Sequence, residues 1–286
     1  MSQPALIIHG GAGAREGSHT TYASYAQSLR RILASAWQTL SAGDAREAVL
    51  TAVRALEDDP IFNAGLGSRL QRDGTARMSA ALMDGDNGSF SGVINIERVR
   101  HPIDVADALH AERHRVLAGA HASRYARDAG LADFDPVTPH RRAEHEQQLA
   151  GEHGTVGAVA LDGEGRIWAG TSTGGVGFEI PGRVSDSATV AGTYADGGVG
   201  VSCTGIGEHI VDHAGAARIA TRVIDGLDLE AAIQRTLDEA DARSFEYGLI
   251  ALDRGGLALA GSTHGVTTLW AARDSHGSRD FVDASA

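Results

Sequence analysis

The chain has few of the features that mark secreted, membrane-spanning or nucleic-acid-binding proteins. It contains one cysteine, Cys203, so an internal disulfide framework is excluded. No apolar run approaches the roughly 18 residues of a membrane span, and the N-terminus lacks the basic and long apolar regions of a signal peptide. The net charge of −12 argues against nucleic acid or an anionic membrane as a partner. We therefore expect a cytoplasmic protein.

What the chain does contain is ordinary for a globular protein of 286 residues, with 42% hydrophobic and 22% charged residues. This length allows one large domain or two small ones, with a sizeable core. The 37 glycines gather in short loops and not in low-complexity tracts, which predicts many tight turns and close backbone approaches.

Predicted strands and helices occur in groups along the chain and do not alternate. Short apolar runs predict strands over 5–8, 78–83, 92–96, 156–161, 167–172, 199–203, 247–252, 257–260 and 268–272. Helical spacing predicts helices from a cap at Thr20 or Thr21 to about Leu40, over 45–56 with Asp44 as the cap, and over 103–113, 116–129, 208–224 and 229–242. This grouping predicts an α+β fold with packed sheets and outer helices. Residues 131–154 hold two prolines and few apolar anchors, so we predict a flexible linker there.

One short stretch suggests a chemistry. Gly154-Thr155-Val156-Gly157 precedes an apolar run, so Thr155 lies where a loop meets a buried strand. A threonine hydroxyl becomes a useful nucleophile when a base is adjacent, and a free N-terminal amine on the same residue is such a base. This hypothesis requires cleavage of the Gly154–Thr155 bond, and glycine tolerates the strained backbone that such a cut involves. From these residues alone, an ordinary strand entry remains the alternative.

Seven motifs carry a resemblance to a known family. They are His9–Gly13, Phe62–Gly65, Met83–Gly85, Gly154–Ala160, Thr171–Gly175, Pro181–Ser187 and Ser202–Glu208. Their order and spacing resemble the plant-type L-asparaginase/isoaspartyl peptidase family of N-terminal-nucleophile hydrolases. The resemblance implies a single domain over 1–286 with a four-layer αββα sandwich. It also implies autoproteolysis into an α fragment, 1–154, and a β fragment, 155–286, which stay associated and form a dimer of αβ pairs.

The resemblance also implies roles for individual residues. Thr155 matches the nucleophile, Thr173 a hydroxyl that tunes it, and Thr204 with Gly205 the oxyanion site. Substrate contacts match Asn63, Arg183, Val184, Ser185, Asp186, Thr204, Gly205, Ile206 and Gly207. Arg183 and Asp186 would hold a free α-carboxylate and α-amine, because a guanidinium fork suits a carboxylate and a carboxylate suits an ammonium.

A structural sodium ion is a further implication of the resemblance. In the family the main-chain carbonyls of a loop would hold the ion, and hard cations prefer such oxygen ligands. The matching residues here are Leu56, Glu57, Asp59, Phe62, Ala64 and Leu66. An ordered loop without an ion is the open alternative. No organic cofactor is expected. Three departures from the family pattern leave the substrate preference open. Ser185 and Tyr247 stand where glycine is common, and Met78-Ser79-Ala80 replaces a more acidic segment.

The expected activity is hydrolysis of L-asparagine or of β-aspartyl dipeptides. A glycosylasparaginase-type amidase and an inactive relative that acts as a binding protein are the alternatives. Ser172 in a G-x-S-x-G pattern suggests a serine esterase, but residues 175–182 do not predict the helix that its nucleophile elbow needs. His209 and His213, with His140 and His145, suggest a metal site, although solvated helix histidines are the favoured interpretation.

Overall fold

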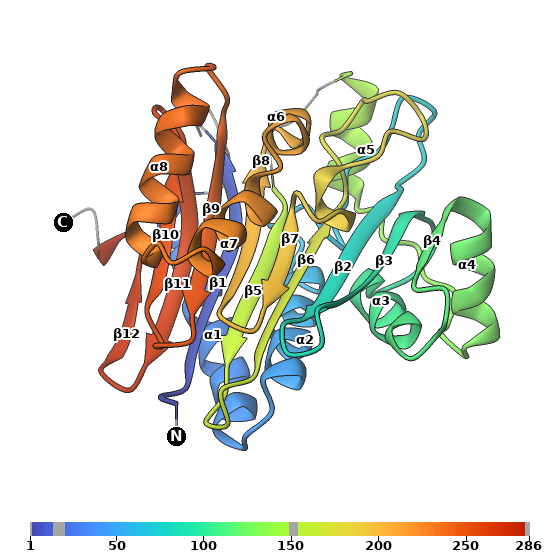
Figure 1. The fold of residues 1–286 in the computed structure, drawn as a ribbon. Helices are drawn as coiled ribbons and strands as arrows, with labels where there is room; N and C mark the ends of the chain where they lie inside the picture. The colour runs from blue at the N-terminus through green and yellow to red at the C-terminus, as the bar shows by residue number, and fades with distance from the viewer. Residues whose placement is uncertain (1, 14–20, 149–153, 284–286) are drawn as a thin grey trace.

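A computed structural model describes residues 2–13, 21–148 and 154–283. Within these ranges the protein has a mixed α/β fold with two β-sheets (Figure 1). The long sheet has the strand order β12-β11-β1-β5-β6-β2-β3-β4, and the short sheet has the order β10-β9-β8-β7.

The described elements have the following bounds. The strands are β1 (Ala5–Gly13), β2 (Met78–Asp84), β3 (Ser89–Ile96), β4 (Val116–Ala118), β5 (Val156–Leu161), β6 (Ile167–Thr173), β7 (Thr193–Asp196), β8 (Val199–Gly205), β9 (Tyr247–Asp253), β10 (Ala258–Ser262), β11 (Thr267–Asp274) and β12 (Gly277–Asp280). The helices are α1 (Tyr22–Ser41), α2 (Ala45–Glu57), α3 (Pro102–His110), α4 (Gly119–Asp128), α5 (Pro139–Glu146), α6 (Gly207–His213), α7 (Gly215–Ile224) and α8 (Leu229–Asp241), with a 3₁₀ turn η1 (Asp186–Ala188).

The long sheet interleaves strands from before and after Thr155. Strand β1 lies between β11 and β5, and both pairings are antiparallel (Figure 1). Leu6, for example, pairs with Arg273 on one side and with Ala160 on the other. Strand β2 likewise pairs with β6. The two parts of the chain on either side of Thr155 therefore share one hydrogen-bonded sheet.

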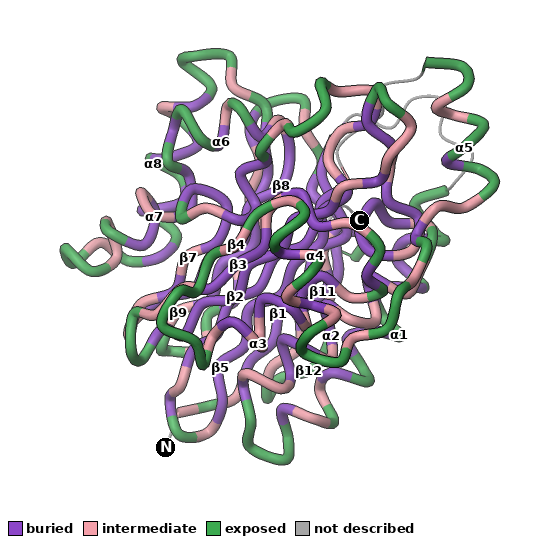
Figure 2. The backbone as a smooth tube through the Cα atoms, turned by 90° about the vertical axis from the view of Figure 1, so that its right-hand side faces the viewer, coloured by how far each residue is buried: buried purple, intermediate pink, exposed green. Residues whose placement is uncertain are grey.

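Both faces of the central strands are covered, which explains their continuous apolar sequence. Along β1, Leu6 and Ile8 pack in a cluster with residues of α1, α2 and α3, whereas Ile7 packs in a cluster with Val159 and Ile250 between the two sheets. A third cluster joins the short sheet to α7 and α8. Figure 2 shows the buried backbone concentrated in the strands. Successive residues of a strand point to opposite faces, so each face of β1 contributes to a different core.

Two predicted helix caps are confirmed. Thr21 Oγ1 accepts from the Ser24 N–H at 3.3 Å, and Asp44 Oδ1 accepts from the Glu47 N–H at 3.0 Å. The alternative cap, Thr20, lies outside the described residues. None of the helices within the described ranges is both long and apolar enough to cross a membrane.

Two predicted helices are wrong in their extent. The segment 116–129 begins with β4, which pairs in parallel with β3, and α4 starts only at Gly119, where φ is +57°. The segment 208–224 is divided into α6 and α7 at Ala214, whose φ of +52° ends the first helix. A left-handed residue cannot continue a right-handed helix, so each segment changes direction there.

The segment 131–154, predicted as a linker, contains helix α5. Thr138 Oγ1 caps this helix by accepting from the Arg141 N–H at 3.3 Å. The Arg141 side chain is buried, and its Nε donates to the Gly67 carbonyl at 2.6 Å. The segment has few apolar residues, and this buried arginine anchors it through a hydrogen bond instead. Residues 149–153 lie outside the described residues.

Strands β7 and β12 were not predicted.

Candidate active site

Thr155 directly precedes β5, and its side chain is buried beside Thr173. Its Oγ1 donates to Thr173 Oγ1 at 3.0 Å. Thr173 is the last residue of β6, the antiparallel neighbour of β5, where Val156 pairs with Ser172. The Gly175 N–H also donates to Thr173 Oγ1, at 3.2 Å. Strand register therefore brings the two predicted hydroxyls together and gives the Thr155 hydroxyl a defined direction.

Gly154 lies against Asn63. A Cβ on Gly154 would come within 2.6 Å of Asn63 Cβ, so this position accepts only glycine. The Asn63 N–H donates to the Gly154 carbonyl at 3.2 Å. The Asn63 side chain bonds elsewhere, because its Nδ2 donates to the Gly175 carbonyl at 2.6 Å and its Oδ1 accepts from the Arg69 N–H at 2.9 Å. Asn63 thus holds the Gly154 carbonyl through its backbone, and its side chain, predicted as a substrate contact, is hydrogen-bonded within the protein.

Thr204 and Gly205 end strand β8 next to Thr155. Thr204 is buried, and its Oγ1 lies 3.5 Å from the Thr155 carbonyl oxygen. Gly205 has a φ of +137°, and a Cβ there would lie 2.5 Å from the Cα of Tyr247, its partner in β9. The fold therefore places the two predicted oxyanion residues beside the predicted nucleophile, and Gly205 leaves no room for another residue type.

Arg183, Asp186 and Gly207 converge at one point. A Cβ on Gly207 would lie 2.7 Å from Arg183 Nη2 and 2.8 Å from Asp186 Oδ1. Arg183 donates from Nε and Nη2 to the Glu208 carboxylate at 2.7 and 2.9 Å. Asp186 is buried, and its Oδ2 has no hydrogen-bond partner among the described residues. Burial raises the pKa of Asp186 from 3.8 to about 7, although Arg183 opposes the shift. A guanidinium and an incompletely satisfied carboxyl group side by side suit a zwitterionic ligand.

The other predicted substrate contacts flank this point. Val184 is 52% exposed. Ser185 Oγ accepts from the Ser187 N–H at 3.3 Å and so caps η1, which positions Asp186. The Ile206 N–H donates to the Glu246 carbonyl at 3.0 Å. These residues shape the backbone around Arg183 and Asp186.

The predicted sodium loop, residues 56–66, is closed by its own backbone. The Leu66 N–H donates to the Glu57 carbonyl at 2.7 Å, and Arg31 pairs with the Asp59 carboxylate at 2.9 Å. A carbonyl oxygen has two lone pairs, so one such bond leaves it able to coordinate a cation. Main-chain and carboxylate oxygens are the donors that hard cations prefer, and the loop therefore fits such an ion.

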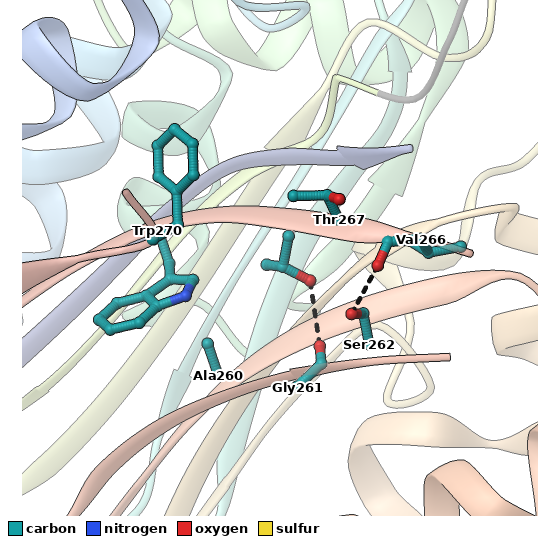
Figure 3. A pocket seen from close by; sticks show the side chains of 8 residues that line it. Ala260, Gly261, Ser262, Val266, Thr267 and Trp270 are labelled. Carbon is teal, nitrogen blue, oxygen red and sulfur yellow. Dashed lines mark hydrogen bonds between the residues drawn. The ribbon is translucent and has the colours of Figure 1, made fainter. Parts of the chain in front are cut away.

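Two surface cavities differ in their relation to these residues. One, of about 540 Å³, adjoins the predicted site, because Arg183 and Glu208 line it together with Arg72, Val176, Glu179 and Ile180. The other, of about 190 Å³, lies between β10 and β11 (Figure 3). Its hydroxyls bond to the protein backbone, since Ser262 Oγ donates to the Val266 carbonyl at 2.7 Å. Of these two cavities, the first therefore adjoins the predicted substrate-binding residues.

Known proteins resemble this chain over most of its length. A model of the asparaginase family matches residues 2–282. The chain belongs to the asparaginase family. The isoaspartyl peptidase/L-asparaginase of Synechocystis sp. is 43% identical over 280 residues, which cover 91% of this chain and 85% of the relative. The plant-type L-asparaginase of Pyrococcus abyssi is 37% identical, covering 91% and 93%. The isoaspartyl peptidase of Salmonella typhimurium is 38% identical, covering 94% and 96%. Membership makes this chain an enzyme of the hydrolase class.

The asparaginase-family site has a polar support that the sequence did not reveal. His9 is fully buried, and its Nε2 lies 2.9 Å from Ser202 Oγ. Ser202 Oγ lies 2.7 Å from Thr171 Oγ1, which accepts from Thr193 Oγ1 at 2.6 Å. Burial lowers the pKa of His9 to about 3, so the imidazole is neutral. This chain of hydrogen bonds joins the two sheets next to Thr155. The His9-Gly10-Gly11 motif was a signal for it, but the partners depend on the fold.

Ser172 is a structural residue in this protein. It is fully buried, and its Oγ donates to Glu57 Oε1 at 2.6 Å. Burial raises the pKa of Glu57 from 4.5 to about 8. Residues 174–185 contain no helix, so the nucleophile elbow of a serine esterase is absent. The esterase alternative is therefore not supported.

The histidines considered as metal ligands make other contacts. His145 Nε2 lies 3.2 Å from the Arg72 carbonyl, and His209 Nδ1 accepts from the Glu246 N–H at 3.0 Å. Among the described residues, no group of three or more histidine, cysteine or acidic side chains is arranged to hold a metal ion. The interpretation of His209 and His213 as solvated histidines is wrong for His213, which is buried, whereas His209 is half-buried.

Proposed function

We propose that this protein hydrolyses the side-chain amide of L-asparagine or of β-aspartyl dipeptides, after cutting its own chain before Thr155. The observation that carries the proposal is the position of the Thr155 hydroxyl. It lies just before β5, Thr173 orients it, and the residue before it, Gly154, has no room for a side chain. Relatives named isoaspartyl peptidase and L-asparaginase support the same activity.

The cut would begin with attack of Thr155 Oγ1 on the carbonyl carbon of Gly154. The C–N bond breaks as an ester forms, the Thr155 nitrogen takes up the hydroxyl proton, and water then hydrolyses the ester. The products are a Gly154 carboxylate and a free Thr155 amine. The Asn63 N–H already donates to the Gly154 carbonyl, where negative charge would develop during the attack.

Hydrolysis of the substrate would use the same oxygen. Thr155 Oγ1 attacks the side-chain carbonyl, and its hydroxyl proton passes to the Thr155 amine. The amine then gives that proton to the departing ammonia or amino acid. Thr204 and Gly205 would stabilise the tetrahedral oxyanion, and each such donor is typically worth roughly 3 kcal/mol. Water finally releases aspartate from the acyl-enzyme.

Recognition would depend on Arg183 and Asp186. The free α-carboxylate of the substrate would bind the Arg183 guanidinium, and the α-ammonium would bind Asp186 and the backbone at Gly207. Gly207 allows this because any side chain there would fill the space between the two groups. Both charges of an amino acid are required, so N-blocked substrates should bind poorly.

The proposal extends to the architecture. We propose that the two sheets and the outer helices form the αββα sandwich of N-terminal-nucleophile hydrolases in one domain, 1–286. Fragments 1–154 and 155–286 would stay together because β1 and β2 pair with β5, β6 and β11 in one sheet. A dimer of such pairs and a cytoplasmic location stay predictions. We further propose a sodium ion in the loop of residues 56–66, with a structural role and no part in catalysis.

Denaturing electrophoresis with N-terminal sequencing tests the cut, and release of ammonia from asparagine and of leucine from β-aspartyl-leucine tests the activity. We expect two fragments, one beginning Thr-Val-Gly-Ala. Thr155→Ala should stay in one piece and lose at least about a thousandfold in activity, whereas Ser172→Ala should keep both properties. Hydrolysis by an uncut chain, or full activity of Thr155→Ala, would refute the proposal.

A further inference from the structure

Helix α6 is held at both ends by the same three residues, 245–247. At its start, the Ile206 N–H donates to the Glu246 carbonyl at 3.0 Å, and the Glu246 N–H donates to His209 Nδ1 at 3.0 Å. At its end, His213 Nδ1 lies 2.8 Å from the Tyr247 hydroxyl. The Glu246 and Tyr247 contacts therefore span the whole helix.

The ring of Phe245 completes this contact. It stacks on His209 with centroids 4.8 Å apart and planes at 16°, and it meets His213 in an edge-on arrangement at 5.8 Å and 74°. Burial lowers the pKa of His213, which keeps its imidazole neutral and able to accept from the Tyr247 hydroxyl. His209 Nδ1 already accepts from a backbone N–H, so it carries no proton. Both imidazoles therefore act as acceptors, His209 toward the Glu246 N–H and His213 toward the Tyr247 hydroxyl.

Helix α6 carries two groups of the candidate site. Gly207 is its first residue, next to Arg183 and Asp186, and Glu208 holds the Arg183 guanidinium through two hydrogen bonds. A helix of only seven residues has no stability of its own in water, so tertiary contacts fix its position. Contacts that hold α6 therefore also set the direction of Arg183.

We propose that His209 and His213 are positioning residues, which fix α6 through residues 245–247 so that Gly207 and Glu208 present Arg183 to the substrate carboxylate. Contacts that hold α6 should affect substrate binding more than the chemical step, because Thr155 lies just before β5 and Thr173 at the end of β6, outside α6. The inference rests on the proposed function, since it assigns the substrate carboxylate to Arg183.

Three variants test this role in the full-length protein. His213→Leu keeps an apolar side chain of similar bulk but removes the acceptor, whereas His213→Asn keeps an acceptor near the position of Nδ1. Tyr247→Phe removes only the hydroxyl. Loss of one such hydrogen bond should raise KM for β-aspartyl-leucine about fivefold to tenfold in His213→Leu and Tyr247→Phe, with kcat within about twofold. His213→Asn should recover most of the affinity.

Matched controls separate positioning from packing. Tyr194→Phe removes a hydroxyl that makes no hydrogen bond among the described residues, and His121→Leu replaces an exposed histidine on α4, so KM should not change in either. Amide hydrogen exchange over residues 207–213 reports the hold on α6 without any substrate, and it should speed up in His213→Leu. If packing alone mattered, His213→Leu would bind substrate better than His213→Asn.

The outcomes distinguish this inference from the proposed function. An unmodified protein inactive on asparagine and on β-aspartyl-leucine refutes the function, and the positioning role with it. Unchanged KM or unchanged exchange in His213→Leu and Tyr247→Phe, in an active protein, refutes the positioning role alone. A variant that fails to fold is replaced in the comparison by His209→Leu, which should raise KM because it removes the acceptor for the Glu246 N–H.

Discussion

The Thr155 hydroxyl donates a hydrogen bond to the Thr173 hydroxyl at 3.0 Å, between neighbouring antiparallel strands. This contact connects strand pairing to the chemistry that we propose. Thr173→Val keeps the shape of the side chain but removes the acceptor. We expect kcat to fall about tenfold to a hundredfold, because the nucleophile loses its direction. Steady-state kinetics on asparagine check this, with a melting temperature to show that the fold is intact. An unchanged kcat would show that Thr173 does not contribute to catalysis.

A pH dependence follows from Asp186. Its pKa of about 7 in the substrate-free protein means that the group is largely protonated in mild acid. A protonated carboxyl does not attract the substrate ammonium, so kcat/KM should rise as pH increases through about 7. Asp186→Asn should lower kcat/KM and remove this step, whereas Asp225→Asn, on the surface, should keep it. If kcat/KM of Asp186→Asn still increased through pH 7, another group would be responsible for the pH dependence.

Titration of Glu57 should make the folded protein less stable as the pH increases from about 4.5 to 8. Its pKa rises from 4.5 to about 8 on folding because the side chain is buried, so the folded state holds a proton that the unfolded state releases. The free energy of unfolding should therefore decrease as pH increases from about 4.5 to 8, by up to about 1.4 kcal/mol per pH unit. Glu57→Gln should flatten this slope. Urea unfolding at several pH values measures it, and equal slopes in both proteins would contradict the prediction.

Sodium should stabilise the loop of residues 56–66 if an ion binds there. We expect the melting temperature to increase with NaCl relative to choline chloride at the same ionic strength, because an ion bound only in the folded state stabilises that state. Equal melting temperatures in the two salts would exclude a sodium site.

Local signals in the sequence were enough to predict many of the helices and strands. The caps at Thr21 and Asp44 act on backbone N–H groups three residues away, so nearby residues reveal them. The break at Ala214 is different. It follows from tertiary contacts on both sides, since α6 is held by residues 245–247 and the Ala216 N–H donates to the Ala191 carbonyl at 2.8 Å. Gly215 next to it is a local signal that a helix can end there, but it does not reveal these tertiary contacts.

The candidate site was predictable only in part for the same reason. Resemblance gave Thr155, Thr173 and Arg183 through their motifs. The pairing of Arg183 with Glu208 and the bond of Ser172 to Glu57 join residues 25 and 115 positions apart, and only the fold brings them together. The two histidines of α6 were noticed for their spacing, yet their role depends on a strand that comes later in the chain.

The interleaving of β1 between β5 and β11 has a consequence for refolding if the chain is cut as we propose. While the chain is continuous, those strands find one another within a single molecule, at a rate independent of concentration. After cleavage, recovery from unfolding becomes an encounter of two separate polypeptides and slows with dilution. Activation would therefore make unfolding close to irreversible at low concentration.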